Sequence, residues 1–370
     1  MPVRTTTRRD GHHVWRRAAA IAVAAAALAA AGPGTGPALA VTKPTPRNLA
    51  GFAADPATGK LVLFGGFEMT GATNAPVNDT WTWSGKAWKK LSPATSPGGR
   101  QGHSMATDKV SRTVVLFGGL AYLSSQTSHA TTLAETWTWD GLARTWTEQT
   151  PPVSPPQRWA ASMAPHPPTG TVVLFGGQPQ PLPGAQLGDT WTWDGAAKAW
   201  TPQAPAVSPP ARSGASMAYD ARRKEVVVFG GYGTDGIPLG DTWTWDGTQW
   251  TEETPATRPP ARASAAMAYD ALRQRVVLFG GYVPGFGKNM ADDTWTWDGT
   301  TWVQQAPLTR PPHRRDASMA YHSGTQKSVL FGGTALINHF FECPAPGPPC
   351  SDGIRADDTW TYGTNWKQKT

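Results

Sequence analysis

The sequence has little cysteine and little charge, and it lacks an apolar segment long enough to cross a membrane. Its 370 residues include two cysteines, and 16% of them are charged. The apolar run from Ala18 to Ala31 is shorter than the roughly 20 residues that a helix needs to span a bilayer. No later segment is more apolar. We therefore expect a soluble protein without a membrane span.

The first forty residues have the pattern of an export signal. An arginine-rich segment ends at Arg17, the apolar run follows, and Ala38-Leu-Ala40 resembles a signal-peptidase site. We predict a signal peptide at 1–40 and a secreted mature chain at 41–370, by either the general secretory or the twin-arginine route. Removing this leader lowers the net charge from +7 to +3. A nucleic-acid partner is therefore not predicted.

The two cysteines lie close together in a proline-rich loop. Cys343 and Cys350 bound the segment Cys-Pro-Ala-Pro-Gly-Pro-Pro-Cys. In an exported chain this spacing favours a local disulfide over free thiols. Such a bond would stiffen one loop and contribute little to the whole fold.

One motif recurs six times along the mature chain. A glycine pair follows Leu-Phe or Val-Phe, a segment acid-Thr-Trp-Thr-aromatic comes next, and a further tryptophan closes the unit. The pairs begin at Gly65, Gly118, Gly176, Gly230, Gly280 and Gly332. The acids are Asp79, Glu135, Asp189, Asp241, Asp293 and Asp358. Because one repeat is too short to bury its own faces, we expect all six to form one closed domain at 41–370.

The fourth repeat predicts four antiparallel strands. Its first strand, within 212–220, consists of small residues suited to crowding near an axis, and its second, within 225–231, is apolar enough for burial on both faces. Its third, at 241–245, alternates Thr and Trp, so that the tryptophan face of one sheet can pack on the threonine face of the next. Asp246-Gly247 suits a tight hairpin to the fourth strand. We predict an all-β, six-bladed β-propeller without a borrowed strand, with an elongated β-solenoid as the alternative.

The repeat resembles the kelch repeat from Pro46 to Trp366. The glycine doublet after an apolar strand, the aromatic strand and the later tryptophan match that family at its usual period. Tryptophan-aspartate repeats also form propellers, but they have a shorter period and lack the doublet. The resemblance implies a monomeric binding or interaction module for a protein or a cell-surface glycan. Its site is expected where the variable loops between second and third strands emerge.

Several residues on that edge are candidates for ligand binding. An arginine begins each repeat, and these arginines either form a basic ring that binds an anion or pair with the acids that begin the third strands. The aromatic candidates are two tyrosines after glycine pairs and two phenylalanines in the longest loop. The tyrosines either stack on a sugar or pack locally, and the loop with the phenylalanines is either a contact surface or a solvated insertion with no partner. The residues are Arg47, Arg100, Arg158, Arg212, Arg262, Arg314, Tyr232, Tyr282, Phe340 and Phe341.

The alternative is a secreted carbohydrate-active enzyme. Kelch-type propellers include the galactose oxidases, copper enzymes with a crosslinked tyrosine and cysteine, but here both cysteines share one loop and the scattered histidines suggest surface residues. The segment Thr296–Trp302 resembles the structural Asp box of sialidases, one residue short. The acids Glu68, Asp235 and Glu342 lie in loops on the expected edge. The Gly231–Gly236 match to a phosphate-binding motif has no helix after it. No catalytic residue, metal or cofactor is assigned.

Overall fold

The computed structural model describes residues 42–70, 73–122, 130–180, 185–285, 289–335 and 354–369. These residues form strands, turns and loops, and no helix in this part of the chain is long and apolar enough to span a membrane. The predicted signal peptide, Phe340, Phe341, Cys343 and Cys350 lie outside the described residues. The predictions made for them remain predictions.

Six four-stranded antiparallel sheets, here called blades 1 to 6, follow one another along the chain. Blade 1 contains β2 (Gly51–Ala54), β3 (Leu61–Phe64), β6 (Thr80–Trp83) and β7 (Trp88–Leu91). Blade 2 contains β8 (Ser104–Asp108), β9 (Thr113–Phe117), β12 (Thr136–Asp140) and β13 (Thr145–Gln149). Blade 3 contains β14 (Ser162–His166), β15 (Thr171–Phe175), β16 (Thr190–Asp194) and β17 (Ala199–Gln203).

The second half of the ring repeats this order. Blade 4 contains β18 (Ser216–Asp220), β19 (Glu225–Phe229), β20 (Thr242–Trp245) and β21 (Trp250–Glu253). Blade 5 contains β22 (Ala266–Asp270), β23 (Arg275–Phe279), β24 (Thr294–Trp297) and β25 (Trp302–Gln305). Blade 6 contains β27 (Ser318–His322), β28 (Lys327–Phe331), β31 (Thr359–Tyr362) and β32 (Trp366–Lys369).

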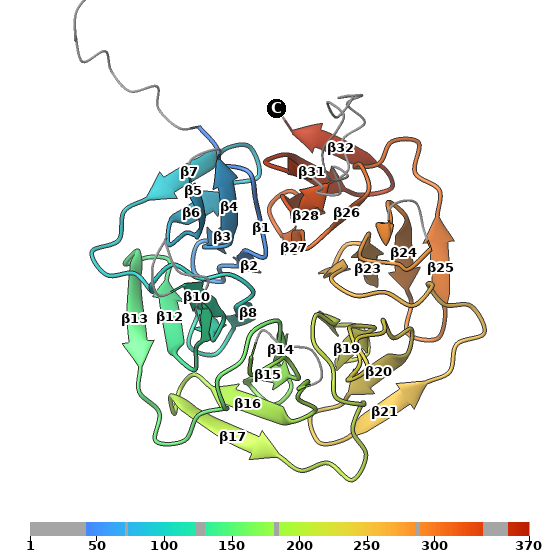
Figure 1. The fold of residues 1–370 in the computed structure, drawn as a ribbon, viewed down its shortest axis with the longest axis horizontal. Coiled ribbons are helices and arrows are strands. Elements are labelled where there is room, and N and C mark those ends of the chain that lie inside the picture. Colours follow the sequence, from blue (N-terminus) through green and yellow to red (C-terminus); the bar gives the residue numbers. More distant parts are fainter. Residues whose placement is uncertain are drawn as a thin grey trace, which may run out of the picture. The chain divides into compact units, whose positions relative to one another are not determined.

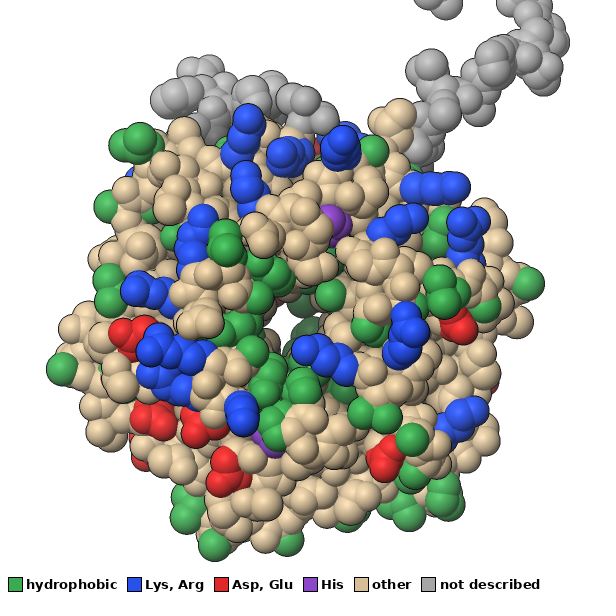
Figure 2. Space-filling model, turned by 180° about the vertical axis from the view of Figure 1, so that it is seen from behind, with side chains coloured by type: hydrophobic (Ala, Val, Ile, Leu, Met, Phe, Trp, Pro, Cys, Tyr) green, Lys and Arg blue, Asp and Glu red, His purple; other side chains and the backbone are tan. Residues whose placement is uncertain are grey.

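The blades close into a ring around a central channel (Figure 1). The first strand of each blade contacts the first strands of both neighbours, and β27 of blade 6 contacts β2 of blade 1. Each sheet takes its four strands from one continuous segment, which confirms the prediction of closure without a borrowed strand. The central opening is visible from the opposite side of the molecule in Figure 2.

Small additional sheets lie on one side of the ring, here called the mouth side. This side carries the connections from second to third strands and from each blade to the next. β1 (Arg47–Asn48) pairs with β4 (Phe67–Thr70), which pairs with β5 (Thr73–Pro76). β10 (Leu120–Tyr122) pairs with β11 (Ala130–Thr132). β26 (Arg314–Arg315), β29 (Thr334–Ala335) and β30 (Ile354–Arg355) form the third small sheet. The tight hairpins within blades lie on the other side, the hairpin side.

The core consists of six apolar layers between adjacent blades. Between blades 3 and 4, Phe175 packs on Trp250 with ring centroids 5.2 Å apart, and Trp245 and Val226 complete the layer. Aromatic side chains contribute large apolar areas, and tilted rings add to this stabilisation. The second strands are buried on both faces, as their apolar sequence predicts.

A hydrogen bond crosses each of these layers. The indole Nε1 of Trp250 in blade 4 donates to Oγ1 of Thr190 in blade 3 over 2.9 Å. The same bond recurs around the ring. It joins the closing tryptophan, on the fourth strand of one blade, to the first threonine on the third strand of the preceding blade, whereas the prediction paired the tryptophans of the third strands with these threonines. The other five pairs are Trp88–Thr359, Trp146–Thr80, Trp200–Thr136, Trp302–Thr242 and Trp366–Thr294.

Candidate binding site at the channel mouth

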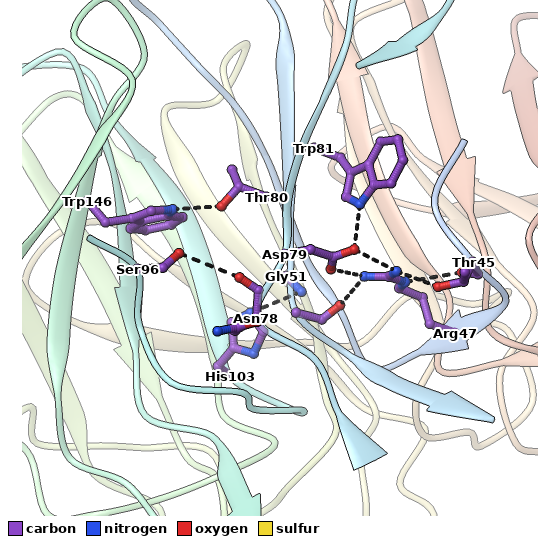
Figure 3. Close-up of polar contacts among 11 residues, drawn as sticks. Thr45, Arg47, Gly51, Asn78, Asp79, Thr80, Trp81, Ser96, His103 and Trp146 are labelled. Carbon is purple, nitrogen blue, oxygen red and sulfur yellow. Dashed lines mark hydrogen bonds and ion pairs between the residues drawn. The ribbon is translucent and has the colours of Figure 1, made fainter. Parts of the chain in front are cut away.

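Each repeated arginine is built into its own blade. In blade 4, Arg212 donates from Nη1 and Nη2 to the two carboxylate oxygens of Asp241 over 2.7 and 2.6 Å, and from Nη1 to the carbonyl of Gly230 over 3.0 Å. Trp243 donates to the same carboxylate over 2.8 Å. Figure 3 shows the corresponding group of blade 1. The other pairs are Arg47–Asp79, Arg100–Glu135, Arg158–Asp189, Arg262–Asp293 and Arg314–Asp358.

These contacts confirm the predicted pairing and show that it lies within blades. The arginines are 1% exposed, so their guanidinium groups lie behind the channel wall and form no open basic ring at its mouth. Burial alone would raise the pKa of Asp241, but the hydrogen bonds and charge of Arg212 outweigh it and hold that pKa below its ordinary value. The six pairs therefore fix the third strand of each blade to the start of its first.

The glycine pair makes room for the arginine backbone of the next blade. A Cβ added at Gly280 would lie 2.5 Å from the carbonyl oxygen of Arg314. The next residue, Gly281, donates its N–H to that same carbonyl over 2.9 Å, with φ of 105°. Side chains are excluded by both the close approach and the positive φ. The doublet is thus a joint between blades.

A closed chain of backbone hydrogen bonds surrounds the channel on the mouth side. Its six residues, here called the mouth belt, each adopt a positive φ between 52° and 62° and each donate an N–H to the carbonyl of the preceding member over 2.7 to 3.0 Å. The last bond, from Leu49 to Asp316, joins blade 1 to blade 6. The belt consists of Leu49, Gly102, Ala160, Gly214, Ser264 and Asp316.

The mouth belt frames a cavity of about 570 Å³. The residues beside the belt differ from blade to blade, although the arginines, glycines and acids behind them repeat. Most of the polar side chains lining the cavity are uncharged, and its charged members among the described residues are Arg315 and Asp316. The uncharged polar and aromatic lining comprises Asn48, His103, Trp159, Gln178, Gln186, Ser213, Tyr232, Ser264 and Ser318.

One wall of the cavity is an aromatic and cationic cluster. The rings of Tyr232 and Tyr282 are 5.8 Å apart, and the guanidinium of Arg315 lies 5.9 Å from the Tyr282 ring. Burial and the charge of Asp316 raise the pKa of Tyr232 to about 12, against an opposing effect of Arg315. Both predicted tyrosines therefore lie together and pack on each other, and its raised pKa keeps Tyr232 neutral at physiological pH.

Trp159 is a further aromatic residue that lines the cavity. It is partly exposed, and a Cβ added at Gly102 of the mouth belt would lie 3.0 Å from its ring. Gln178 pairs with the backbone of Trp159, and its Oε1 accepts from Ser213 over 3.4 Å. Trp159 is not among the site residues predicted from the sequence. The sequence feature that could have indicated it is a tryptophan that lies outside the repeat pattern and directly follows a repeated arginine.

The expectation that the histidines lie at the surface is wrong for three of them. His103, His166 and His322 are buried. The first accepts the backbone N–H of Gly51 through Nε2 over 3.2 Å (Figure 3). The other two bond Thr169 and Thr325 in hairpins where other blades use an aspartate. A neutral imidazole nitrogen accepts a hydrogen bond as a carboxylate does, so these histidines serve the fold.

Among the described residues, few side chains suited to catalysis line the cavity at the channel mouth. Within the described ranges, no group of three or more His, Cys, Asp or Glu residues is placed to hold a metal ion, and Asp316 is the carboxylate that lines the cavity. Asp235 accepts the N–H of Ile237 in its own loop, and Glu68 lies in β4. The third candidate, Glu342, lies outside the described residues.

Comparison with known proteins identifies the repeat. The model of the KLHDC2/KLHL20/DRC7 Kelch-repeats domain matches residues 167–368, more than half of the chain. The solved structure titled "Structure of YjhT" has a TM-score of 0.63 and 14% sequence identity, covering 89% of this chain and 99% of that one. No curated protein matches the sequence. A kelch propeller suggests a protein-interaction module. The chain belongs to the kelch-repeat family of β-propeller proteins.

Proposed function

We propose that this protein is a binding module that receives part of a partner protein in the cavity at the channel mouth. This proposal rests on one observation: the residues that differ from blade to blade lie together at the channel mouth. The repeated residues build the ring, whereas the non-repeated Trp159, Tyr232 and Arg315 line one cavity of about 570 Å³. Ligand sites typically combine aromatic walls with a few polar groups in a cavity of this size.

The lining suits an uncharged or weakly charged segment. Arg315 and Asp316 lie 3.6 Å apart as an ion pair, so their charges offset each other at the mouth. The amides of Gln178 and Gln186 and the hydroxyl groups of Ser213 and Ser264 are suited to bonding the backbone of a peptide. A turn or chain end of a partner therefore fits better than a polyanion or a polycation.

A cell-surface glycan is the second candidate ligand, because aromatic rings with nearby amides also suit sugar rings. The alternative function is a carbohydrate-active enzyme. Cleavage of a glycosidic bond uses an acid and a second carboxylate or a tyrosine placed together, and the described lining contributes Asp316 and Tyr232. We further propose that the protein is a monomer and that it acts outside the cell, the location that its leader sequence favours.

Selection from a random peptide display library, with a glycan array in parallel, tests this proposal. Trp159→Ala should weaken the selected ligand at least tenfold, because a central aromatic anchor typically contributes more than about 1.4 kcal/mol. The matched control is Leu142→Ala, a 68% exposed apolar residue in a hairpin of blade 2, which should change affinity less than twofold. Equal binding by the wild type and Trp159→Ala would show that the mouth is not the site. Glycan binding in place of peptide binding would transfer the proposal to the second ligand.

A further inference from the structure

A second cavity lies between blades 5 and 6, on the hairpin side of the ring. Its volume is about 350 Å³, and it is separate from the channel mouth. Arg273 belongs to the first hairpin of blade 5, and Arg275 begins β23. On the face opposite to that turned to the viewer in Figure 1, Lys and Arg side chains are spread over the blades, and hydrophobic side chains lie at the edge of the central opening (Figure 2). The polar side chains that line the cavity are Asp270, Arg273, Arg275, Thr296, Gln305, Tyr362 and Thr364.

The cavity exists because blade 6 departs from the repeat. Blade 5 has Trp297-Asp298-Gly299 at the end of its third strand, whereas blade 6 has Tyr362-Gly363 and is one residue shorter. The indole is thus replaced by the smaller phenol, and the aspartate is missing. Compared with the corresponding place between blades 4 and 5, this one has a smaller aromatic ring and no hairpin carboxylate.

The missing aspartate leaves an arginine without its expected neighbour. Arg223 of blade 4 lies against the Asp298-Gly299 turn, where a Cβ added at Gly299 would overlap its guanidinium. The equivalent Arg273 lies against Gly363, with Nη2 at 3.0 Å from an added Cβ. The two arginines therefore occupy the same place in their blades, but only the first has a hairpin carboxylate beside it.

Two further acids of blade 4 are also replaced. Glu225 and Glu253, whose charges interact, correspond to Arg275 and Gln305 in blade 5. The site between blades 4 and 5 thus has four carboxylates and one arginine, whereas the site between blades 5 and 6 has one carboxylate and two arginines. The first set is Asp220, Glu225, Glu253, Asp298 and Arg223, and the second is Asp270, Arg273 and Arg275.

The positive charge at this cavity is only partly offset. Arg273 donates from Nη1 to Oδ2 of Asp270 over 2.8 Å, and Asp270 is fully buried while the arginine side chain is 33% exposed. Within the described part of the chain, no carboxylate lies within ion-pair distance of Arg275, which is exposed. One guanidinium with remaining N–H donors and one without an ion-pair partner therefore flank the same space.

We propose that this cavity is a binding site for a small oxyanion, such as phosphate, sulfate or the carboxylate of an acidic sugar. Arg273 and Arg275 are the charged donors, because guanidinium groups match the planar oxygen pairs of such anions. The hydroxyl of Thr364 lines the same space. This site is independent of the ligand proposed for the channel mouth.

Calorimetric titration at constant ionic strength, with inorganic phosphate, sulfate and glucuronate as separate probes, tests the proposal. The wild type should bind at least one of them saturably, and the preferred probe identifies the source of the anion. Arg275→Glu, which restores the acid found in blade 4, should weaken binding at least tenfold. Lys327→Glu makes the same charge change at the equivalent position of blade 6 and should alter affinity less than threefold.

A second variant restores the missing repeat residue. Insertion of an aspartate between Tyr362 and Gly363 gives this hairpin the length found in blades 1, 4 and 5, and should abolish anion binding while preserving the thermal unfolding midpoint measured without anion. The proposal is wrong if none of the three anions binds the wild type saturably. It is also wrong if Arg275→Glu and Lys327→Glu weaken binding equally, because a diffuse basic surface would then account for it.

Discussion

Gly51 and His103 replace the serine and alanine that bond across other blade interfaces, and the effect of this replacement on stability can be measured. At four other blade interfaces a serine Oγ donates to the carbonyl of an alanine in the next blade, as Ser162 does to Ala215 over 2.7 Å. Between blades 1 and 2 the serine is replaced by Gly51 and the alanine by His103. A Cβ at Gly51 would lie 2.5 Å from the imidazole Nε2, so the histidine occupies the space that glycine leaves.

Burial, assisted by the positive charge of Arg100, lowers the pKa of His103 to about 3 from its ordinary value near 6.5. The folded protein therefore binds fewer protons here than the unfolded chain, and stability falls as the pH falls through this range. The stabilisation that comes from a neutral His103 is fully present above pH 6.5. At about 1.4 kcal/mol per pH unit, the free energy of unfolding falls by roughly 2 kcal/mol at pH 5 and by about 4 kcal/mol at pH 3, where the imidazole in the folded protein is half protonated.

The double variant Gly51→Ser with His103→Ala recreates the common interface and removes the titrating group. We expect its free energy of unfolding in urea to lose about 2 kcal/mol less than that of the wild type between pH 7 and pH 5. His103→Ala alone should destabilise by about 1 to 3 kcal/mol at pH 7, because the N–H of Gly51 loses its acceptor. If the pH profiles of the wild type and the double variant run parallel, His103 is not held neutral by the fold.

Two further predictions concern the joints of the blades. Arg212→Ala should destabilise the protein by about 3 kcal/mol in urea unfolding, because Asp241 loses its partner. The control, Arg258→Ala at an exposed arginine, should change stability by less than about 0.5 kcal/mol. Equal effects of the two substitutions would contradict a structural role for the pair. Gly280→Ala should lower the free energy of unfolding by at least about 3 kcal/mol, because an added Cβ overlaps the backbone and φ is 69°. The control, Gly59→Ala, has the same φ but open space around the Cβ, and should lower it by about 1 kcal/mol. Similar losses would show that the positive φ alone, without the overlap, determines the loss.

The fold was predictable because six copies of one pattern constrain it together. The Asp246-Gly247 hairpin, with φ of 110° at the glycine, and the buried strand Glu225–Phe229 follow from local residue types. The pairing of Arg212 with Asp241 also follows from their recurrence. The direction of that arginine does not, since sequence spacing cannot tell whether a side chain at the start of a strand turns toward the channel or into its own blade.

The mouth belt was harder to find. Only Gly102 and Gly214 suggest a positive φ at this repeat position, because the other four members have side chains and adopt this conformation under the constraint of the closed ring. His103 was missed for a related reason. The other repeats have alanine at the position of His103, so this histidine departs from the pattern. The reason for the departure is clear only when Gly51 of the neighbouring blade is known to lie beside it.

The most direct test of the binding proposal is a crystal structure of the protein with its tightest selected peptide. We predict that the peptide enters the channel mouth and contacts Trp159 on one wall and Arg315 on the other. A peptide bound on the hairpin side or along the outer strands, with the mouth empty, would contradict the assignment of the site.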